Sequence, residues 1–133
     1  MVENTKPTLG YWQIRGLGQQ IRYLLAYCGV DFDDKMYAVS KNEDGSWSRA
    51  AWTDVKHTLG YDFPNLPYYQ DGTVKLSETS AIMRYICNKY KKELLGTTLD
   101  ESAHMDMMEG VIGVLKAAAT GPCYRGTERS EII

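Results

Sequence analysis

Two aromatic residues, Tyr11 and Trp12, stand near the end of a short apolar segment, before a basic loop flanked by glycines and then a predicted helix. A phenol hydroxyl can donate a hydrogen bond to a neighbouring reactive group. A tyrosine near a strand end is nevertheless more often a half-buried packing residue. The residues around Tyr11 must therefore decide whether its hydroxyl has a chemical role.

The other reactive side chains show no spacing typical of a metal centre or a hydrolytic site. Cys28, Cys87 and Cys123 are far apart and form no C-x-x-C pair, which predicts neither a disulfide framework nor a zinc site. We interpret them as core fillers or half-buried thiols. His57 and His104 have no partner at metal or triad spacing, so we expect both on the surface.

Composition excludes several classes of function. The 133 residues fit one ordinary domain, or one small domain plus the beginning of another. The content of 44% hydrophobic residues is typical of a globular protein. The net charge of −2 does not indicate the basic surface expected of a protein that binds nucleic acid. No apolar run approaches the ~18 residues of a membrane span, and the first residues lack the pattern of a signal peptide. We therefore expect a cytoplasmic protein that binds neither nucleic acid nor membrane.

The elements that must position Tyr11 form a predicted β-α-β unit followed by a hairpin and a helix. An apolar helical face lies between the first two strands, and Gly29 is predicted to end that helix. Asp71 and Gly72 form the hairpin turn. The predicted strands cover residues 8–14, 35–39, 66–69 and 73–76.

Two further segments complete the prediction for the first part of the chain. Residues 40–63 are polar and broken by glycine, and we predict a long irregular loop that carries Trp47 and Trp52. Ser77 is predicted to cap a helix over 78–90. The inward-facing positions of that helix are Ile82, Tyr85, Ile86 and Tyr90. Arg22, on the polar side of the first helix, is interpreted as structural.

A last helix is predicted over 101–119, with one apolar face. That face carries Met105, Met108, Ile112, Leu115 and Ala119. Residues 120–133 predict no further element on which the helix could pack. We therefore expect something else to cover this face.

Three segments, LGYWQIRGL, LGYDFPNLPYY and LSETSAIMRYI, together resemble the mu class of glutathione transferases in their order and spacing. The resemblance implies an α/β fold, with a thioredoxin-like βαβ-ββα domain over residues 1–90. At 91–133 it implies a linker and the first helix of an incomplete all-α domain. It also implies a dimeric, cytoplasmic detoxification enzyme that joins the thiol of glutathione, its co-substrate, to a small electrophile, without a metal.

The resemblance gives two residues a catalytic role. Tyr11 matches the tyrosine whose hydroxyl donates a hydrogen bond to the glutathione sulfur, which favours thiolate over thiol. A free thiol has a pKa of about 8.5, and lowering it by about two units corresponds to roughly 2.7 kcal/mol. Tyr124, in PCYRG, matches a tyrosine that lines the electrophile pocket and can assist as an acid.

The other implied site residues bind the tripeptide. Trp52 and Lys56 match residues that bind the carboxylate of its glycyl end. The backbone of Leu66, before a cis Pro67, matches the segment that pairs with the cysteinyl part like an added strand. The implied set of glutathione-binding residues is Trp12, Leu17, Trp52, Lys56, Asn65, Leu66, Pro67, Glu78 and Thr79.

Glu78 and Thr79 fall where this class usually has Gln-Ser, at a helix start that suits the γ-glutamyl carboxylate. The charge of Glu78 must then face the ligand's amino group. Phe63 and Arg84 match residues of a homodimer interface. The family's aspartate that reaches a partner's glutathione would fall near Val114, so this contact is not predicted.

Two other hypotheses remain open at this point. The chain reaches only the start of the helical domain, so it fits an interaction or structural module in a larger protein assembly, with a retained glutathione pocket. It equally fits a truncated version of a longer enzyme.

Overall fold

The computed structural model describes residues 6–125, without the side chains of the last two. The chain divides into two compact units, Met1–Lys91 and Lys92–Ile133, which we describe separately. No helix in the described range is long and apolar enough to cross a membrane.

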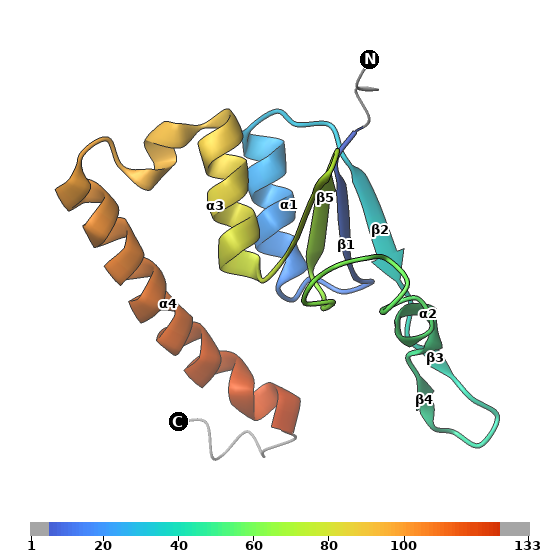
Figure 1. Ribbon diagram of the computed structural model, residues 1–133. Helices are drawn as coiled ribbons and strands as arrows, with labels where there is room; N and C mark the ends of the chain where they lie inside the picture. Colours follow the sequence, from blue (N-terminus) through green and yellow to red (C-terminus); the bar gives the residue numbers. More distant parts are fainter. Residues whose placement is uncertain (1–5, 126–133) are drawn as a thin grey trace. The chain divides into compact units, whose positions relative to one another are not determined.

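The first unit is built on a four-stranded mixed sheet in the order β2-β1-β5-β6. Its strands are β1 (Thr8–Trp12), β2 (Asp33–Tyr37), β5 (Tyr68–Asp71) and β6 (Val74–Ser77). Strand β1 is parallel to β2 and antiparallel to β5, which is antiparallel to β6. Helices α1 (Gly18–Tyr27) and α3 (Thr79–Tyr90) lie side by side against one face of this sheet (Figure 1). The predicted βαβ-ββα order and thioredoxin-like fold are confirmed.

The main core lies between these helices and the sheet. Its fully buried members are Leu9, Ile21, Leu25, Tyr69, Ile82 and Ile86. Each helix contributes two of these core members, and the two are four positions apart, so they lie on one face one turn from each other. Burying an aliphatic side chain of this size contributes about 1.5–3 kcal/mol. This core therefore fixes the sheet on which the candidate site is built.

Strand boundaries differ from the predicted ones for local reasons. β1 ends at Trp12 because the chain turns there, with the Gln13 N–H donating to the Tyr37 carbonyl and the Ile14 N–H to that of Trp12. β5 begins at Tyr68 rather than at residue 66, since Pro67 has no N–H to donate to a ladder. β2 covers 33–37 rather than 35–39, and β6 covers 74–77 rather than 73–76.

The prediction that Ser77 caps the third helix is wrong. Glu78 occupies the N-cap position of α3, and its side chain makes no capping hydrogen bond. The Ser77 hydroxyl instead donates to the Phe63 carbonyl at 2.6 Å. Ser77 is therefore used to hold the preceding loop rather than to start the helix.

The segment predicted to be irregular contains short regular elements. Strands β3 (Ser40–Lys41) and β4 (Trp47–Ser48) pair as a small separate sheet, and α2 (Ala50–Thr53) is a single helical turn. The turn of the small hairpin is held by Asp44, whose carboxylate accepts from the Ser46 N–H and hydroxyl. These elements are too short for sequence periodicity to reveal them.

The second unit contains a 3-10 turn, η1 (Lys92–Leu95), and one long helix, α4 (Leu99–Arg125). The helix begins before residue 101 because Thr98 and Glu101 form a capping box, each side chain accepting from the other's N–H at 3.2 Å. The four larger residues of its predicted apolar face are between 48% and 64% exposed: Met105, Met108, Ile112 and Leu115. That something else covers this face stays a prediction.

Candidate functional site

One end of the main sheet gathers several of the predicted site residues. Register places Gly10, Tyr68 and Ser77 in one row across β1, β5 and β6. Because β5 runs opposite to its two neighbours, the residues that follow Gly10 and Ser77 and those that precede Tyr68 meet at the same edge. The predicted site residues adjoining this row are Tyr11, Leu66, Pro67 and Glu78.

The Tyr11 hydroxyl is held by the backbone of the glycine-flanked loop. Tyr11 is buried, and its hydroxyl oxygen accepts a hydrogen bond from the Leu17 N–H at 3.0 Å. A Cβ added at Gly16 would lie 2.6 Å from that oxygen, and one at Gly18 would lie 2.6 Å from the ring carbon Cδ1. The two glycines therefore let the loop pack directly against the ring, and Leu17 acts on Tyr11 through its N–H.

A second buried cluster joins Tyr11 to two more predicted site residues, Trp52 and Leu66. Its other buried members are Tyr37 and Tyr68, which the sequence analysis did not single out. Their positions could have identified them, because each lies at the end of a strand, at the same edge of the sheet as Tyr11. Trp12 is partly buried against the same cluster.

Lys56 follows Trp52 in a helical turn, with its N–H donating to the Trp52 carbonyl at 2.9 Å. Lys56 is half-buried, and across residues 6–123 its ammonium forms no ion pair with an acidic side chain. A partly desolvated cation without an acidic partner can bind an anionic ligand. This environment is compatible with the predicted carboxylate contact.

The Leu66–Pro67 peptide is cis, as the resemblance implied. The Leu66 N–H donates to the Asn65 side-chain oxygen at 2.9 Å. A ligand that pairs with this N–H in strand fashion therefore requires the Asn65 side chain to turn away. Asn65 thus controls access to this backbone donor.

Glu78 has a backbone conformation that residues other than glycine rarely adopt, with φ at 70° and ψ at 119°. Thr79 then begins α3. Because the Glu78 side chain does not cap the helix, N–H groups of the first turn remain available to an acceptor. The geometry suits a carboxylate at this helix start.

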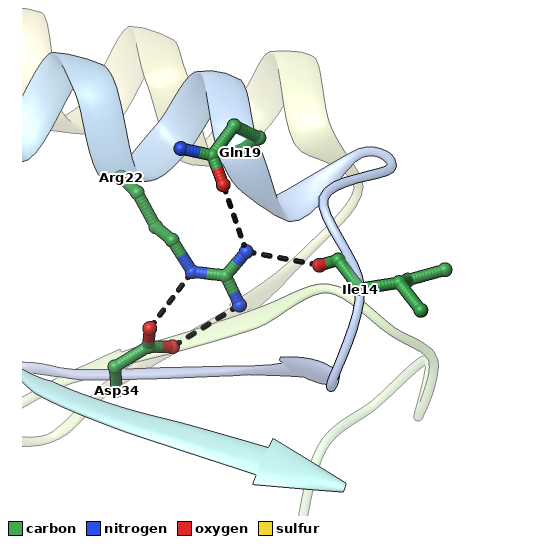
Figure 2. A network of polar contacts seen from close by, with 4 residues as sticks. All are labelled: Ile14, Gln19, Arg22 and Asp34. Carbon is green, nitrogen blue, oxygen red and sulfur yellow. Dashed lines mark hydrogen bonds and ion pairs between the residues drawn. The ribbon is translucent and has the colours of Figure 1, made fainter. Parts of the chain in front are cut away.

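Arg22 has the structural role that the sequence analysis gave it (Figure 2). Its guanidinium binds both carboxylate oxygens of Asp34, at 2.8 and 3.3 Å. Nη1 also donates to the Ile14 carbonyl at 3.1 Å and to the Gln19 side chain at 3.4 Å. Arg22 therefore connects α1 and β2 to the loop that encloses Tyr11.

The remaining predicted residues belong to the loop before β5, to α3 and to α4. Phe63 is 79% exposed, and Arg84 lies in α3. Tyr124 belongs to α4 in the other unit, and its side chain lies outside the described part. Val114, the position without the expected aspartate, is exposed.

The histidines and cysteines provide no metal centre among the described residues. His57 and His104 are exposed, as expected. Cys87 is buried and Cys28 half-buried, in agreement with their interpretation as packing residues, whereas Cys123 is exposed.

Comparisons with known proteins agree with this architecture. The family model of the glutathione S-transferase N-terminal domain matches residues 7–88. A glutathione S-transferase of Tyrophagus putrescentiae is 54% identical over 106 residues, which are 80% of this chain and 46% of that protein. Glutathione S-transferase Mu 1 of Bos taurus is 41% identical over 116 residues, 87% of this chain and 51% of that protein.

The crystal structure of the glutathione S-transferase Blo t 8 matches with a TM-score of 0.71 and 30% identity, covering 84% of this chain and 50% of that one. The chain spans about half the length of the curated relatives it matches, 46% and 51% for the two above. The family model matches the first unit from the residue before β1 to a point within α3. The chain therefore belongs to the glutathione S-transferase family, and residues 7–88 form its amino-terminal domain.

Proposed function

We propose that this chain supplies the glutathione-binding part of a glutathione transferase of the mu class, in which the Tyr11 hydroxyl stabilises the thiolate of bound glutathione. The observation that carries the proposal is the hydrogen bond from the Leu17 N–H to the Tyr11 hydroxyl oxygen, at 3.0 Å. With that N–H bound to its oxygen, the hydroxyl has its own proton left to donate. A donor directed at sulfur favours S⁻ over SH and so lowers the pKa of the thiol.

The proposed reaction is the addition of that thiolate to an electrophile. The thiol proton leaves for solvent, the sulfur electron pair forms a carbon–sulfur bond, and the electrophile releases its leaving group or takes up a proton. Tyr124 is the proposed acid for the electrophile. Holding both reactants makes the attack effectively intramolecular.

The tripeptide is proposed to lie along the edge of the sheet that carries Tyr11. Its glycyl carboxylate binds Trp52 and the ammonium of Lys56, a half-buried residue. Its cysteinyl part pairs with the backbone of Leu66, next to Asn65 and Pro67. Its γ-glutamyl carboxylate binds the start of α3, with Trp12, Leu17, Glu78 and Thr79 completing the set.

Dimerisation is proposed through the exposed Phe63 and through Arg84. The Ser77 hydroxyl holds the Phe63 carbonyl, which fixes the loop that presents this ring. We further propose a cytoplasmic protein with a role in detoxification. The family match favours this enzyme over the hypothesis of an interaction module in a larger assembly.

Proton release on binding tests the proposal. Glutathione is titrated into the protein by calorimetry at pH 7.5, in buffers of different ionisation enthalpy. A thiol pKa lowered by about two units releases most of one proton on binding. S-methylglutathione, which has no thiol proton, and the Tyr11→Phe variant with glutathione should each release almost none. Binding of glutathione to the unaltered protein without proton release would contradict the role of Tyr11.

A further inference from the structure

A hydrogen-bonded pair of tyrosines spans strand β1 at the edge of the sheet that carries Tyr11. The hydroxyl oxygens of Tyr37, at the end of β2, and Tyr68, at the start of β5, are 3.0 Å apart, and both residues are buried. Strand β1 lies between those strands. A Cβ at Gly10 of β1 would lie 2.1 Å from the Tyr68 ring, so the ring can occupy this position only because Gly10 has no side chain.

Trp52 packs against both members of this pair. Its ring stacks on Tyr68, with centroids 5.9 Å apart and planes at 27°. It also makes a T-shaped contact with Tyr37, with centroids 5.3 Å apart and planes at 64°. Aromatic pairs in these arrangements contribute beyond their buried area. The single turn α2 that carries Trp52 is too short to be stable alone, so these contacts hold it against the sheet.

Lys56 depends on the same support. The N–H groups of Val55 and Lys56 both donate to the Trp52 carbonyl, at 3.1 and 2.9 Å. The position of the Lys56 backbone is therefore set by that of Trp52. Any movement of the indole shifts the start of the turn from which the ammonium extends.

We propose that Tyr37 and Tyr68 are positioning residues for the glycyl end of glutathione, because their hydrogen-bonded pair fixes Trp52 and, through the following turn, Lys56. This inference rests on the proposed function and deepens it. Neither tyrosine needs to touch the tripeptide. Their effect is confined to one end of the ligand, whereas Tyr11 acts on the sulfur.

The chemistry of the pair fits a fixed structural contact. Burial raises the pKa of the Tyr68 hydroxyl, and the hydrogen bond with Tyr37 raises that pKa further, so the Tyr68 hydroxyl stays protonated at neutral pH. Removal of either hydroxyl leaves the other buried without its partner. Both single variants should therefore loosen the same contact.

Tyr61 provides a matched control within the same cluster. Its ring lies 5.0 Å from that of Tyr68, and its hydroxyl is buried. Within the described range that hydroxyl has no hydrogen-bond partner. Tyr61→Phe therefore removes a phenol oxygen from the same cluster, as Tyr37→Phe and Tyr68→Phe do, but without breaking a hydrogen bond.

The test compares two ligands that differ only at the glycyl end. Affinities of glutathione and of γ-glutamylcysteine, which lacks the glycine, are measured by calorimetry for the unaltered chain, Tyr37→Phe, Tyr68→Phe and Tyr61→Phe. We expect Tyr37→Phe and Tyr68→Phe to bind glutathione about fivefold more weakly, because displaced Trp52 and Lys56 would cost the glycyl carboxylate the equivalent of one ordinary hydrogen bond. Both variants should bind γ-glutamylcysteine as the unaltered chain does. Tyr61→Phe should bind both ligands like the unaltered chain.

Other outcomes overturn the inference. Equal weakening of both ligands would make the pair a general support of the fold, and no weakening of either would deny it a role in binding. Urea unfolding of each variant shows that the chains compared are folded. The proposed function is tested separately by the thiol pKa of glutathione on the unaltered protein, which Tyr37→Phe should leave unchanged because the contact between Leu17 and Tyr11 is outside the pair.

Discussion

At the scale of single residues, the Tyr11 side chain is held largely by backbone. The Leu17 N–H donates a hydrogen bond to its hydroxyl oxygen. The α-carbons of Gly16 and Gly18 lie so close to Tyr11 that a Cβ on either would clash with its side chain. Gly16 also has φ at +38°, in the region that glycine adopts without the penalty of a Cβ. The sequence predicted a glycine-flanked turn after Tyr11. It could not predict that the turn folds back onto the ring, since this depends on the tertiary position of α1.

Gly16→Ala should impair the activation of the thiol. The added Cβ would lie 2.6 Å from the Tyr11 hydroxyl oxygen, so the hydroxyl must move from its position. We expect the pKa of the bound glutathione thiol to rise by about one unit, which corresponds to about 1.4 kcal/mol. Thiolate absorbance of the bound ligand, followed against pH, measures this change.

Gly110→Ala is the matched control for that substitution, because a Cβ at Gly110 in α4 meets nothing within 4 Å. It should leave the thiol pKa unaltered. S-methylglutathione should bind the Gly16→Ala variant nearly as well as the unaltered chain, because its methylated sulfur has no thiol proton to lose. An unchanged thiol pKa in Gly16→Ala would show that the Tyr11 hydroxyl is not held as described.

At the scale of elements, the edge of the sheet is ordered by contacts between segments that are distant in sequence. Helical periodicity predicted α1 and α3, because their core residues lie one turn apart, and β1 was predicted as a short apolar segment. Periodicity gave no signal for α2, which is one turn long and is held by Tyr37 and Tyr68 through Trp52. The boundary of β5 was missed because Pro67 cannot join the ladder although its neighbours are apolar.

Arg22→Met should destabilise the first unit. The side chains of Arg22 and Asp34 are only 12% and 23% exposed, and the guanidinium also holds the Ile14 carbonyl. Removing a cation from a partly buried, two-point contact leaves the Asp34 carboxylate with fewer donors. We expect the free energy of unfolding in urea to fall by about 2 kcal/mol.

Lys6→Met serves as the control, since the Lys6–Asp31 pair is exposed, at 53% and 75%. Exposed pairs contribute little to stability, so this variant should unfold at the same urea concentration as the unaltered chain. If Arg22→Met were as stable as Lys6→Met, the network in Figure 2 would have no part in holding the loop before α1.

At the scale of the whole molecule, the two units differ in how much they bury. The first unit has two buried clusters, whereas no described side chain of α4 is buried. The sequence predicted a helix in this unit, but the helix covers 99–125 rather than 101–119. The large residues of its predicted apolar face are exposed, so the cover expected for that face stays a prediction.

Amide hydrogen exchange should separate the two units. Amides of α1 and α3 are expected to exchange slowly, because opening them exposes the main core. Amides in the middle of α4 should exchange much faster if nothing covers its apolar face, since a single helix without a packed face is only marginally stable in water. Equal protection in α4 would mean that this face is covered in solution.

The ultraviolet absorbance of the glutathione thiolate, titrated against pH on the unaltered protein and on Tyr11→Phe, tests the account most directly. For the unaltered protein we expect an apparent thiol pKa about two units below that of free glutathione, near 6.5 if the free value is about 8.5. In Tyr11→Phe, which keeps the ring and loses only the donor, the value should return toward that of the free thiol. A bound thiol with an unshifted pKa, or one equally shifted in Tyr11→Phe, would contradict the role that we assign to the Tyr11 hydroxyl.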